Sequence, residues 1–456
     1  PDGGKDENVF DIRQGVAIAF FVKNSPSLPA EKGPGKVYHA DCYGLRQEKY
    51  DWLDAHTLAD TPWAALTPQT PFYLFTPHDA TSEAEYRRYP SVPEVFPINS
   101  VGIVTARDGF VFDFDLDALK RRIWTLRDTA MPDELVGQAF DLRDKTGWTL
   151  NAARTALRQD AAWETKFTRC LYRPFDSRWL FYYPALIERS REEVMRHMLA
   201  GENLALITAR SNKSPTVDHF FCSKHIVETK CGESTVQSYT FPLYLYPDLD
   251  APQKDLFAVL KPAERRPNLH PALLPALAAA YGREPSPEEV FYYVYAVLYA
   301  PTYRARYAAF LRMDFPRIPF TAEAEVFAAL AALGRRLVDL HLLRSPELDP
   351  PACRFEGAGD SVVGRGKTGL RYDPTAERVY INAAQYFGPV PPDVWAYQVG
   401  GYQVCEKWLK DRCERRLALD DIRTYCHIVT ALGITLAIQA EIDAVYAAVE
   451  RETVSF

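Results

Sequence analysis

The sequence predicts an α+β protein in which an opening β-hairpin leads into a mixed region of short strands and helices, followed by a helical region. Three observations predict this order. An apolar run of strand length occupies residues 15–22, short aromatic strand patterns alternate with helical patterns between about 60 and 255, and from 271 the apolar residues repeat at helical spacing. No repeat of solenoid period is visible.

Composition places the chain among ordinary soluble globular proteins. Of its 456 residues 47% are hydrophobic and 25% are charged, which excludes wholesale disorder and a collagen-like or coiled-coil rod. The longest apolar runs fall short of the ~18 residues that a membrane span needs, and no signal-peptide pattern opens the sequence. The eight cysteines are scattered without a disulfide-like rhythm. We therefore expect reduced thiols, a cytoplasmic location and no membrane partner.

The charge balance limits how the protein could hold a nucleic acid. With 53 basic and 60 acidic residues the net charge is −7, which argues against a protein that coats nucleic acid through its overall charge. DNA binding through a local basic surface stays compatible with this balance. The aromatic content of 13% and the 34 prolines favour irregular, loop-rich binding domains.

The opening hairpin is predicted from two short segments. Residues 15–22 form a solid apolar run, and residues 36–41 form a second strand after a Pro- and Gly-rich loop. A strand that is apolar on both faces belongs inside a sheet covered on both sides, and a two-stranded hairpin alone is marginal. We therefore expect the other strands of this sheet upstream of the chain, and we assign residues 1–55 to the hairpin.

A mixed α/β domain is predicted over residues 56–255. Aromatic strand patterns bounded by Pro, Gly and Asn turns occur here, and two helical patterns lie between them. The strands are expected at 110–114, 180–183, 204–208 and 241–246, and the helices at 116–127 and 191–199.

Two further regions complete the predicted organisation. A helical subdomain is expected at 256–345, because Ser286, Pro287 and Glu289 form an N-cap, a first-turn proline and a capping box. Leucines at 330, 333, 337 and 340 then follow a helical stripe. From 346 to 456 we expect a Gly-rich β-like stretch (356–387), a helix at 395–412 and a last helix from 420.

Two groups of residues invite a metal interpretation. Asp218, Glu228 and Lys230 imitate a nuclease motif in which two carboxylates hold Mg²⁺ and the lysine polarises a water, although charges on the wet face of a strand explain them equally well. Four potential zinc ligands follow each other at spacings that match no standard finger, and buried thiols with surface imidazoles are the favoured interpretation: His219, Cys222, His225 and Cys231. No metal site and no catalytic residue are assigned.

Cofactor loops are also missing. Gly364-Arg-Gly-Lys-Thr-Gly369 resembles a phosphate loop, but Ser361 stands where the motif needs glycine, so a glycine-rich hairpin tip is favoured. Neither a Gly-rich methyltransferase loop nor an Asn/Asp-Pro-Pro-aromatic tetrapeptide occurs. We therefore expect no cofactor in this chain.

The DNA-binding candidates come from the stretch between 170 and 215, where basic and aromatic residues interleave. Its last part is the loop Arg210-Ser211-Asn212-Lys213, directly after the strand at 204–208. Arginine can pair with guanine and asparagine with adenine, whereas lysine and serine suit phosphate. Arg107, Arg189 and Arg191 are further candidates. A solvated loop is the alternative, and the segment 175–179 could instead hold a structural Asp–Arg pair under an aromatic lid.

Several segments together resemble one family. Asn-Val-Phe-Asp-Ile-Arg-Gln-Gly-Val-Ala-Ile at 8–18 resembles the last hairpin of the adenine-N6 DNA methyltransferase domain in type ISP and related type IIG single-chain restriction–modification enzymes. Tyr-Arg-Pro-Phe-Asp-Ser-Arg-Trp at 172–179 is similar to their C-terminal specificity domain. Further similar segments follow in family order: 187–191, 194–198, 292–304, 316–319 and 394–409.

The resemblance implies target recognition rather than catalysis. It implies that a Rossmann-like methyltransferase domain lies upstream with the S-adenosylmethionine site, joined in some members by nuclease and helicase domains. This chain would be the target-recognition domain that binds double-stranded DNA and presents an adenine to that methyltransferase. Two alternatives stay open: an Mg²⁺ nuclease at Asp218, Glu228 and Lys230, and a protein-interaction scaffold built on the helices at 287–343.

Overall fold

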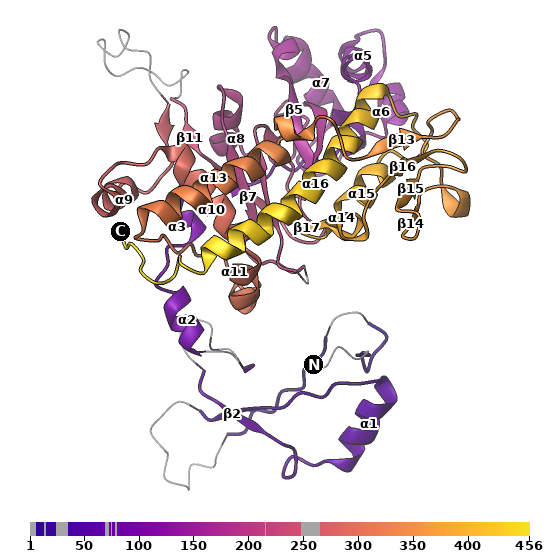
Figure 1. Ribbon diagram of the computed structural model, residues 1–456. Helices are drawn as coiled ribbons and strands as arrows, with labels where there is room; N and C mark the ends of the chain where they lie inside the picture. The colour runs from indigo at the N-terminus through magenta and orange to yellow at the C-terminus, as the bar shows by residue number, and fades with distance from the viewer. Residues whose placement is uncertain are drawn as a thin grey trace. The chain divides into compact units, whose positions relative to one another are not determined.

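In the computed structural model of the protein the chain divides into two units, Pro1–Thr81 and Ser82–Phe456 (Figure 1). The structure describes residues 6–12, 15–23, 35–68, 73, 75–77, 80–214, 216–247 and 265–456. The division lies beyond the boundary predicted after residue 55. Residues 56–81 fall in the first of these two compact units.

The first unit is built on one antiparallel strand pair. Strand β1 (Val37–His39) pairs with β2 (Ala64–Leu66), and α1 (Arg46–Ala55) lies between them in sequence. The expected strand at 36–41 is thus confirmed. The expected strand at 15–22 is wrong for this structure, because residues 15–23 pair with no described residue and Phe21 is 88% exposed. A strand needs a hydrogen-bonded neighbour, and apolar character alone supplies none.

Two four-stranded sheets organise the first half of the second unit. Sheet 1 has the order β3-β10-β7-β8 and is antiparallel throughout. Sheet 2 has the order β4-β6-β5-β9, with β5 and β9 parallel. The strands of sheet 1 are β3 (Ser100–Val101), β7 (Ala205–Ala209), β8 (Phe220–Ser223) and β10 (Ser238–Pro242). Those of sheet 2 are β4 (Phe112–Asp113), β5 (Phe167–Arg173), β6 (Asp176–Phe181) and β9 (Ile226–Val227).

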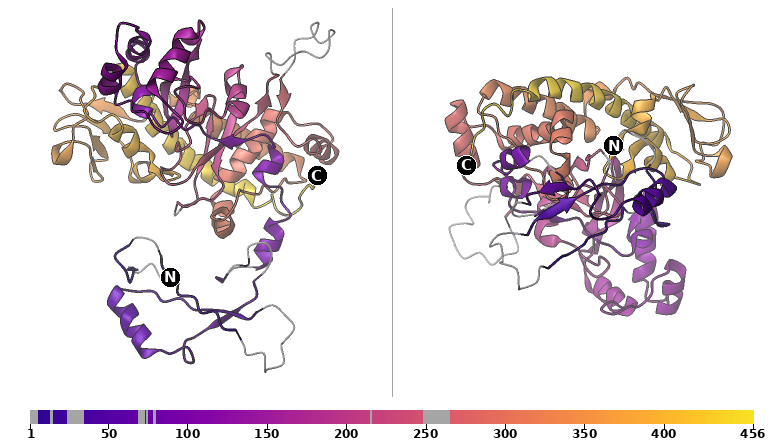
Figure 2. Two further views of the ribbon diagram at one scale, coloured as in Figure 1. Left: turned by 180° about the vertical axis from the view of Figure 1, so that it is seen from behind. Right: turned by 90° about the horizontal axis from the view of Figure 1, so that it is seen from below.

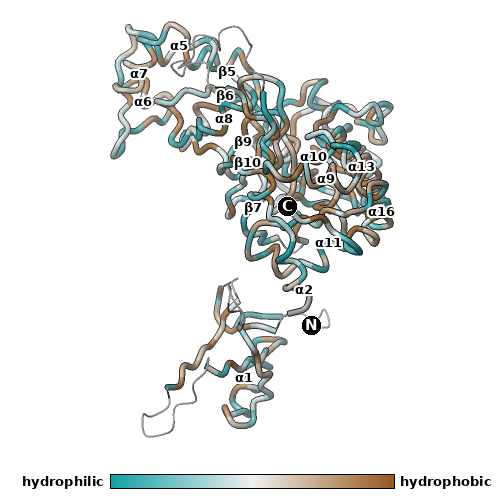
Figure 3. Tube along the Cα trace, turned by 90° about the vertical axis from the view of Figure 1, so that its left-hand side faces the viewer, coloured by the Kyte–Doolittle hydropathy of each residue, from teal (hydrophilic) through white to brown (hydrophobic). Residues whose placement is uncertain are grey.

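A helical lobe lies beside sheet 2, away from the long C-terminal helices (Figures 2 and 3). Helix α5 (Leu116–Arg127) has the predicted bounds, because the Asp115 carboxylate accepts from the Ala118 amide at 2.7 Å and caps its first turn. It buries Leu119, Ile123 and Leu126. The other helices of the lobe are α4 (Asp108–Val111), α6 (Asp133–Phe140), α7 (Leu150–Gln159), η1 (Trp163–Lys166) and α8 (Glu192–Leu199).

The largest hydrophobic core surrounds α10 (Pro287–Tyr299), which Ser286 and Glu289 cap as predicted. Gly334 of α13 (Ala324–His341) allows the two helices to approach closely, because a Cβ there would lie 1.9 Å from the Tyr292 carbonyl oxygen. Helix α16 (Leu419–Tyr446) packs on both. By length and composition α16 could cross a membrane, but it serves here as a core helix. The expected helical subdomain therefore shares one core with the C-terminal region.

The C-terminal region contains a third four-stranded sheet of order β13-β16-β15-β14, which confirms the expected β-like stretch. The helix expected at 395–412 is interrupted: a hairpin of β17 (Gln398–Val399) and β18 (Tyr402–Gln403) separates α14 (Pro392–Ala396) from α15 (Val404–Lys410). The Gly-Gly turn explains the break, since Gly400 adopts a φ of +61°. Residues 364–369 contain one 3-10 turn, η4 (Gly366–Thr368), and do not lie between a strand and an α-helix.

The strands of the third sheet are β13 (Arg354–Glu356), β14 (Arg371–Asp373), β15 (Arg378–Tyr380) and β16 (Tyr386–Gly388). Short elements connect the larger parts. They are α2 (Ala80–Tyr86), α3 (Val92–Val95), β11 (Tyr244–Leu245), β12 (Arg266–Pro267), α9 (Leu273–Tyr281), α11 (Pro301–Arg306), α12 (Ala308–Leu311), η3 (Pro346–Leu348) and η4 (Gly366–Thr368). Within the strand expected at 110–114, Phe110 and Val111 end the helical turn α4, whereas Phe112 and Asp113 form β4 and pair with β6.

Candidate nucleic-acid interface

Three loop segments meet at one end of sheet 1. Strands β3 and β7 both run antiparallel to β10, so both finish where β10 begins. Ala209 at the end of β7 pairs with Ser238, and the Gly102 amide after β3 donates to the Ser238 carbonyl oxygen at 2.9 Å. We call this place the loop end of sheet 1; it consists of residues 102–107, 210–214 and 228–237. Loops on a rigid sheet are common positions for binding residues.

The predicted Arg210–Lys213 loop is part of the loop end. Arg210 and Lys213 are exposed, and Ser211 is half-buried. The Arg210 side chain is 66% exposed and its Nε donates to the Asp314 carboxylate at 3.1 Å. An exposed ion pair of this kind is worth only about 0–1 kcal/mol, so the guanidinium can exchange partners at little cost. Arg210 and Lys213 are therefore two exposed cations on the loop that the sequence predicted.

Asn212 differs from the other residues of this loop because its side chain is 2% exposed. Its backbone amide donates to the Leu311 carbonyl oxygen at 3.0 Å, and its side-chain amide bonds to the Ser214 hydroxyl at 2.9 Å. With the amide oxygen and nitrogen exchanged, the oxygen accepts from the backbone amides of Asp218 and His219. Either orientation commits Asn212 to shaping the loop, which leaves it unable to read a base in this conformation.

Arg107 is also placed by structural contacts. Its guanidinium stacks on the Trp148 ring at 3.7 Å and donates to the Leu186 carbonyl oxygen at 3.3 Å. The side chain is 6% exposed, and burial lowers the pKa of the guanidinium from its ordinary value. The structure therefore holds Arg107 beneath the surface.

The other two predicted arginines lie near the same end of sheet 1. Arg189 is exposed, and its backbone pairs with Val104. Arg191 precedes α8 with a φ of +54°, and its Nε is buried without a hydrogen-bond partner among the described residues. Arg189 therefore joins Arg210 and Lys213 as an exposed predicted cation, and Arg191 is partly withdrawn. DNA contact by all these residues stays a prediction.

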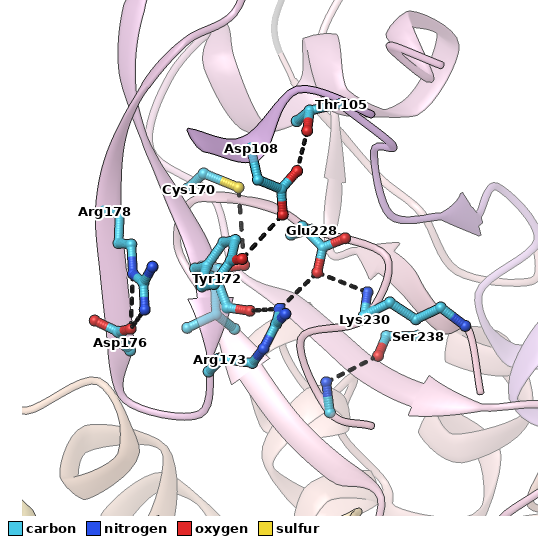
Figure 4. A network of polar contacts seen from close by, with 12 residues as sticks. Thr105, Asp108, Cys170, Tyr172, Arg173, Asp176, Arg178, Glu228, Lys230 and Ser238 are labelled. Atoms are coloured by element: carbon cyan, nitrogen blue, oxygen red, sulfur yellow. Dashed lines mark hydrogen bonds and ion pairs between the residues drawn. The ribbon is translucent and has the colours of Figure 1, made fainter. Parts of the chain in front are cut away.

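The carboxylates of the proposed nuclease do not form a metal site. Glu228 is 5% exposed and accepts from the Arg173 guanidinium at 2.7 Å and from the Lys230 amide at 2.8 Å (Figure 4). Asp218 accepts from the Ser214 hydroxyl at 2.8 Å and from Thr216. In the part of the chain that the structure describes, no three His, Cys, Asp or Glu side chains converge as metal ligands. The nuclease alternative therefore loses its geometric basis.

The four potential zinc ligands do not converge as a metal site among the residues that the structure describes. His219 is fully buried rather than on the surface as expected, and its Nε2 lies 2.9 Å from the Ser238 hydroxyl. Burial lowers the pKa of His219 to about 4 and raises that of the Cys222 thiol to about 12. A neutral imidazole and a protonated thiol in different contacts pack as core residues.

An ionic network lies beneath the loops and confirms the Asp–Arg pair expected at 175–179 (Figure 4). The Asp176 carboxylate accepts from Arg178 at 2.6 Å and from Arg412 at 2.9 Å. Arg178 in turn stacks on Tyr172 at 3.9 Å and on Phe114 at 4.4 Å, which form the aromatic lid. These cations are internally neutralised, so much of the basic stretch between 170 and 180 is structural.

The C-terminal hairpin supports the loop end from below, a role that sequence reasoning missed. The Gly401 amide donates to the Gly232 carbonyl oxygen at 3.0 Å, and the Tyr402 hydroxyl donates to the Lys230 carbonyl oxygen at 3.2 Å. A Cβ on Gly400 would lie 2.2 Å from the Gly232 carbonyl oxygen. The Gly-Gly dipeptide was the available signal, since it marks a tight turn.

A cavity of about 520 Å³ elsewhere in the second unit is a weaker candidate. It is lined by Arg344, Asp349, Arg423 and His427 among others. Asp349 pairs with both Arg423 and His427, at 3.3 Å and 3.0 Å, and Arg344 pairs with Asp339. Its cations are therefore paired with carboxylates, whereas Lys213 at the loop end forms no ion pair with the residues that the structure describes.

A mixed α+β unit that presents cationic loops at one end of a small sheet defines a candidate nucleic-acid-binding domain. The sequence profile described as the Type ISP C-terminal specificity domain matches residues 94–437. The chain belongs to this family. No curated protein sequence matches this chain significantly.

Solved structures share the fold. A cryo-EM structure of a DrdV–DNA complex superposes with a TM-score of 0.66 at 20% identity, over 89% of this chain and 43% of that chain. A nuclease-deletion mutant of the Type ISP restriction-modification enzyme LlaGI, in complex with a DNA substrate mimic, gives 0.61 at 20% identity over 89% and 33%. The ATP-dependent Type ISP enzyme LlaBIII bound to DNA gives 0.63 at 17% identity over 90% and 28%. The present chain thus spans less than half of each of these proteins.

Proposed function

We propose that this chain recognises a specific sequence in double-stranded DNA, as the specificity part of a restriction–modification enzyme that methylates adenine at N6. The observation that carries the proposal is the exposure of Arg210 and Lys213 on a loop whose base, Asn212, is buried and hydrogen-bonded. A fixed loop with exposed cationic ends suits groove and phosphate contacts, because little conformational entropy is lost on binding. Two further findings support the proposal: the chain belongs to a specificity-domain family, and the related solved structures are complexes with DNA.

DNA recognition and methyl transfer would lie in different domains of the parent protein. The methyltransferase, with its S-adenosylmethionine site, would be a separate domain upstream, and the assembly would act in the cytoplasm. Extruding a base from the duplex costs a few kcal/mol, and phosphate and groove contacts made by this chain would offset that cost. With a net charge of −7, the chain must make these contacts locally.

The rival functions have less support in the structure. Glu228 is neutralised by Arg173 and lies in no metal cluster within the described residues. A scaffold on the helices at 287–343 would need an exposed apolar face, but α10 buries Val290, Phe291 and every residue from Tyr293 to Tyr299. Helices α10 and α13 both bury their apolar residues in the core.

Duplex binding tests the proposal directly. The full chain is incubated with a pool of random duplexes, with and without Mg²⁺, and the retained DNA is sequenced. We expect one sequence to be enriched, the DNA to stay intact, and binding not to require Mg²⁺. Retention of every duplex alike would contradict sequence-specific recognition, and cleavage only with Mg²⁺ would restore the nuclease.

A further inference from the structure

Gln237 lies directly across the end of sheet 1 from Arg210. The register of β7 and β10 pairs Ser238 with Ala209 and Tyr239 with Thr208. The next positions outward are therefore Gln237 and Arg210, which face each other just beyond the last paired residues. Both side chains are exposed. The turn before β10 and the loop after β7 thus present two polar side chains as neighbours.

The chemistry of Gln237 suits one base. Its amide has one acceptor and two donor hydrogens, and it makes no hydrogen bond to any residue that the structure describes. In the major groove glutamine can pair bidentately with N6 and N7 of adenine, as arginine pairs with O6 and N7 of guanine. Both side chains extend from the loops at the end of sheet 1, where β7 and β10 are the two inner strands.

The segment that carries Gln237 is held in place from both sides. The Ser238 hydroxyl contacts His219 at 2.9 Å and accepts from the Gly232 amide at 3.2 Å. The hairpin of β17 and β18 holds Gly232 and Lys230 from the other side. A pre-ordered loop loses little entropy when it binds, which favours a reading role over a passive one.

Polar atoms without partners mark the same place. His219 Nδ1, Thr229 Oγ1 and Glu233 Oε2 are buried, and none has a hydrogen-bond partner among the described residues. Unsatisfied buried polar groups are uncommon in proteins and are often found at functional sites.

We infer that Gln237 is a second base-reading residue, which contacts an adenine in the base pair next to the one read by Arg210. The inference rests on the proposed function, since it assumes that the loop end enters the major groove of duplex DNA. It assigns an A·T pair to one position of the target and places that position beside a G·C pair. Glutamine reads the adenine and arginine the guanine.

Binding-site selection on the full chain tests this assignment with three variants. Gln237→Ala should lower the preference for adenine at one position by about 5- to 150-fold and leave the other positions unchanged. Gln237→Glu should shift that same position toward cytosine, because a carboxylate accepts from cytosine N4. Gln159→Ala is the matched control, since Gln159 is exposed at the end of α7 in the helical lobe. It should select the wild-type sequence.

The outcomes separate the two proposals. If wild type selects a sequence and both Gln237 variants select it with the same preference at every position, the inference is wrong and the proposed function stands. If wild type selects no sequence, both fall together. Should Gln237→Ala fail to fold, the Gln237→Glu result alone decides: an unchanged preference overturns the assignment, and a shift toward cytosine supports it.

Discussion

The carboxylate of Asp176 and the guanidinium of Arg412 are 236 residues apart in sequence, yet they lie 2.9 Å apart in the interior of the second unit. Arg412 also stacks on the Trp408 ring at 3.4 Å, and Arg178 donates to the same carboxylate. The contact joins sheet 2 to the end of α15, just after the hairpin that supports the loop end. This buried group of charged side chains therefore links sheet 2 to the hairpin that supports the loop end.

Removing the carboxylate from this group should destabilise the fold strongly. Asp176→Ala removes the buried carboxylate that both guanidinium groups share, and it leaves Arg178 with Asp411 at 2.9 Å and Arg412 with Asp421 at 3.5 Å. Breaking such a buried group costs about 3–5 kcal/mol in unfolding free energy. Asp141→Asn is the control, because Asp141 pairs with Arg143 at the surface, with side chains 79% and 85% exposed, and asparagine tolerates the φ of +50° at this position. It should change stability by less than about 0.5 kcal/mol. Urea unfolding measures both, and equal losses in the two variants would show that the buried group contributes nothing special.

Buried histidines should make the protein less stable in mild acid. Burial lowers the pKa of His219 to about 4, and burial together with Arg304 lowers that of His341 to about 3. The unfolded chain has histidines of pKa about 6.5 and binds protons first as the pH falls. The stability that these neutral histidines contribute is therefore fully present above pH 6.5, and it is lost as the pH falls toward 4.

The expected loss between pH 7 and 5.5 is about 1 kcal/mol for each of these histidines. Unfolding curves at the two pH values measure it. His219→Asn removes one titrating group, so this variant should lose less stability than wild type over the same interval. An identical loss in both proteins would show that His219 is protonated in the folded state.

Arg210 and Lys213 should affect DNA binding in different ways. If Arg210 reads a base, Arg210→Ala costs about 1–3 kcal/mol and relaxes preference at one position. If Lys213 meets only phosphate, Lys213→Ala weakens binding to all sequences alike and reduces the salt slope by about one unit. Affinity measured over a salt series, with selection on each variant, separates the two roles. If both variants bind as wild type does, this loop is solvated surface and recognition lies elsewhere, first at Arg189.

The chain alone should bind no S-adenosylmethionine. Its sequence lacks a Gly-rich cofactor loop and the catalytic tetrapeptide, and both would be supplied by an upstream domain. Calorimetric titration of the full chain with the cofactor should release no binding heat. Titration of a longer parent protein that includes the upstream domain is the positive control. Micromolar binding by the chain alone would overturn the division of work proposed above.

Local signals predicted the elements that depend on neighbours in sequence. Asp115 and the Leu119–Ile123–Leu126 stripe defined α5, and Ser286 with Glu289 defined the start of α10. The strand expected at 15–22 failed because strand formation depends on a partner, which periodicity does not supply. The helix expected at 395–412 failed because its Gly-Gly turn outweighed the helical pattern around it.

The candidate site was predictable only in part for a related reason. A sequence shows which residues can bind DNA, but burial is decided by distant partners. Arg107 is covered by Trp148, Asn212 by the segment around Leu311, and Glu228 is neutralised by Arg173, 55 residues away. Exposure of Arg210 and Lys213 followed from their place at a strand end. Gln237 was missed because its position opposite Arg210 depends on the strand register.

The C-terminal hairpin offers a test of how loop position controls recognition. A Cβ on Gly400 would lie 2.2 Å from the Gly232 carbonyl oxygen, and the φ of +61° already disfavours other residues there. Gly400→Ala should therefore displace the 228–237 segment and the neighbouring His219 ring, whose Nδ1 would lie 3.2 Å from the new Cβ. A far-UV circular dichroism spectrum like that of wild type would show that the fold is kept. We expect weaker binding to the selected sequence but an unchanged salt slope, because no phosphate contact is removed. Gly147→Ala is the matched control: Gly147 also has a positive φ, +82°, but a Cβ there would meet nothing within 4 Å. If both variants discriminate between sequences as well as wild type does, the hairpin stabilises the fold without setting the geometry of recognition.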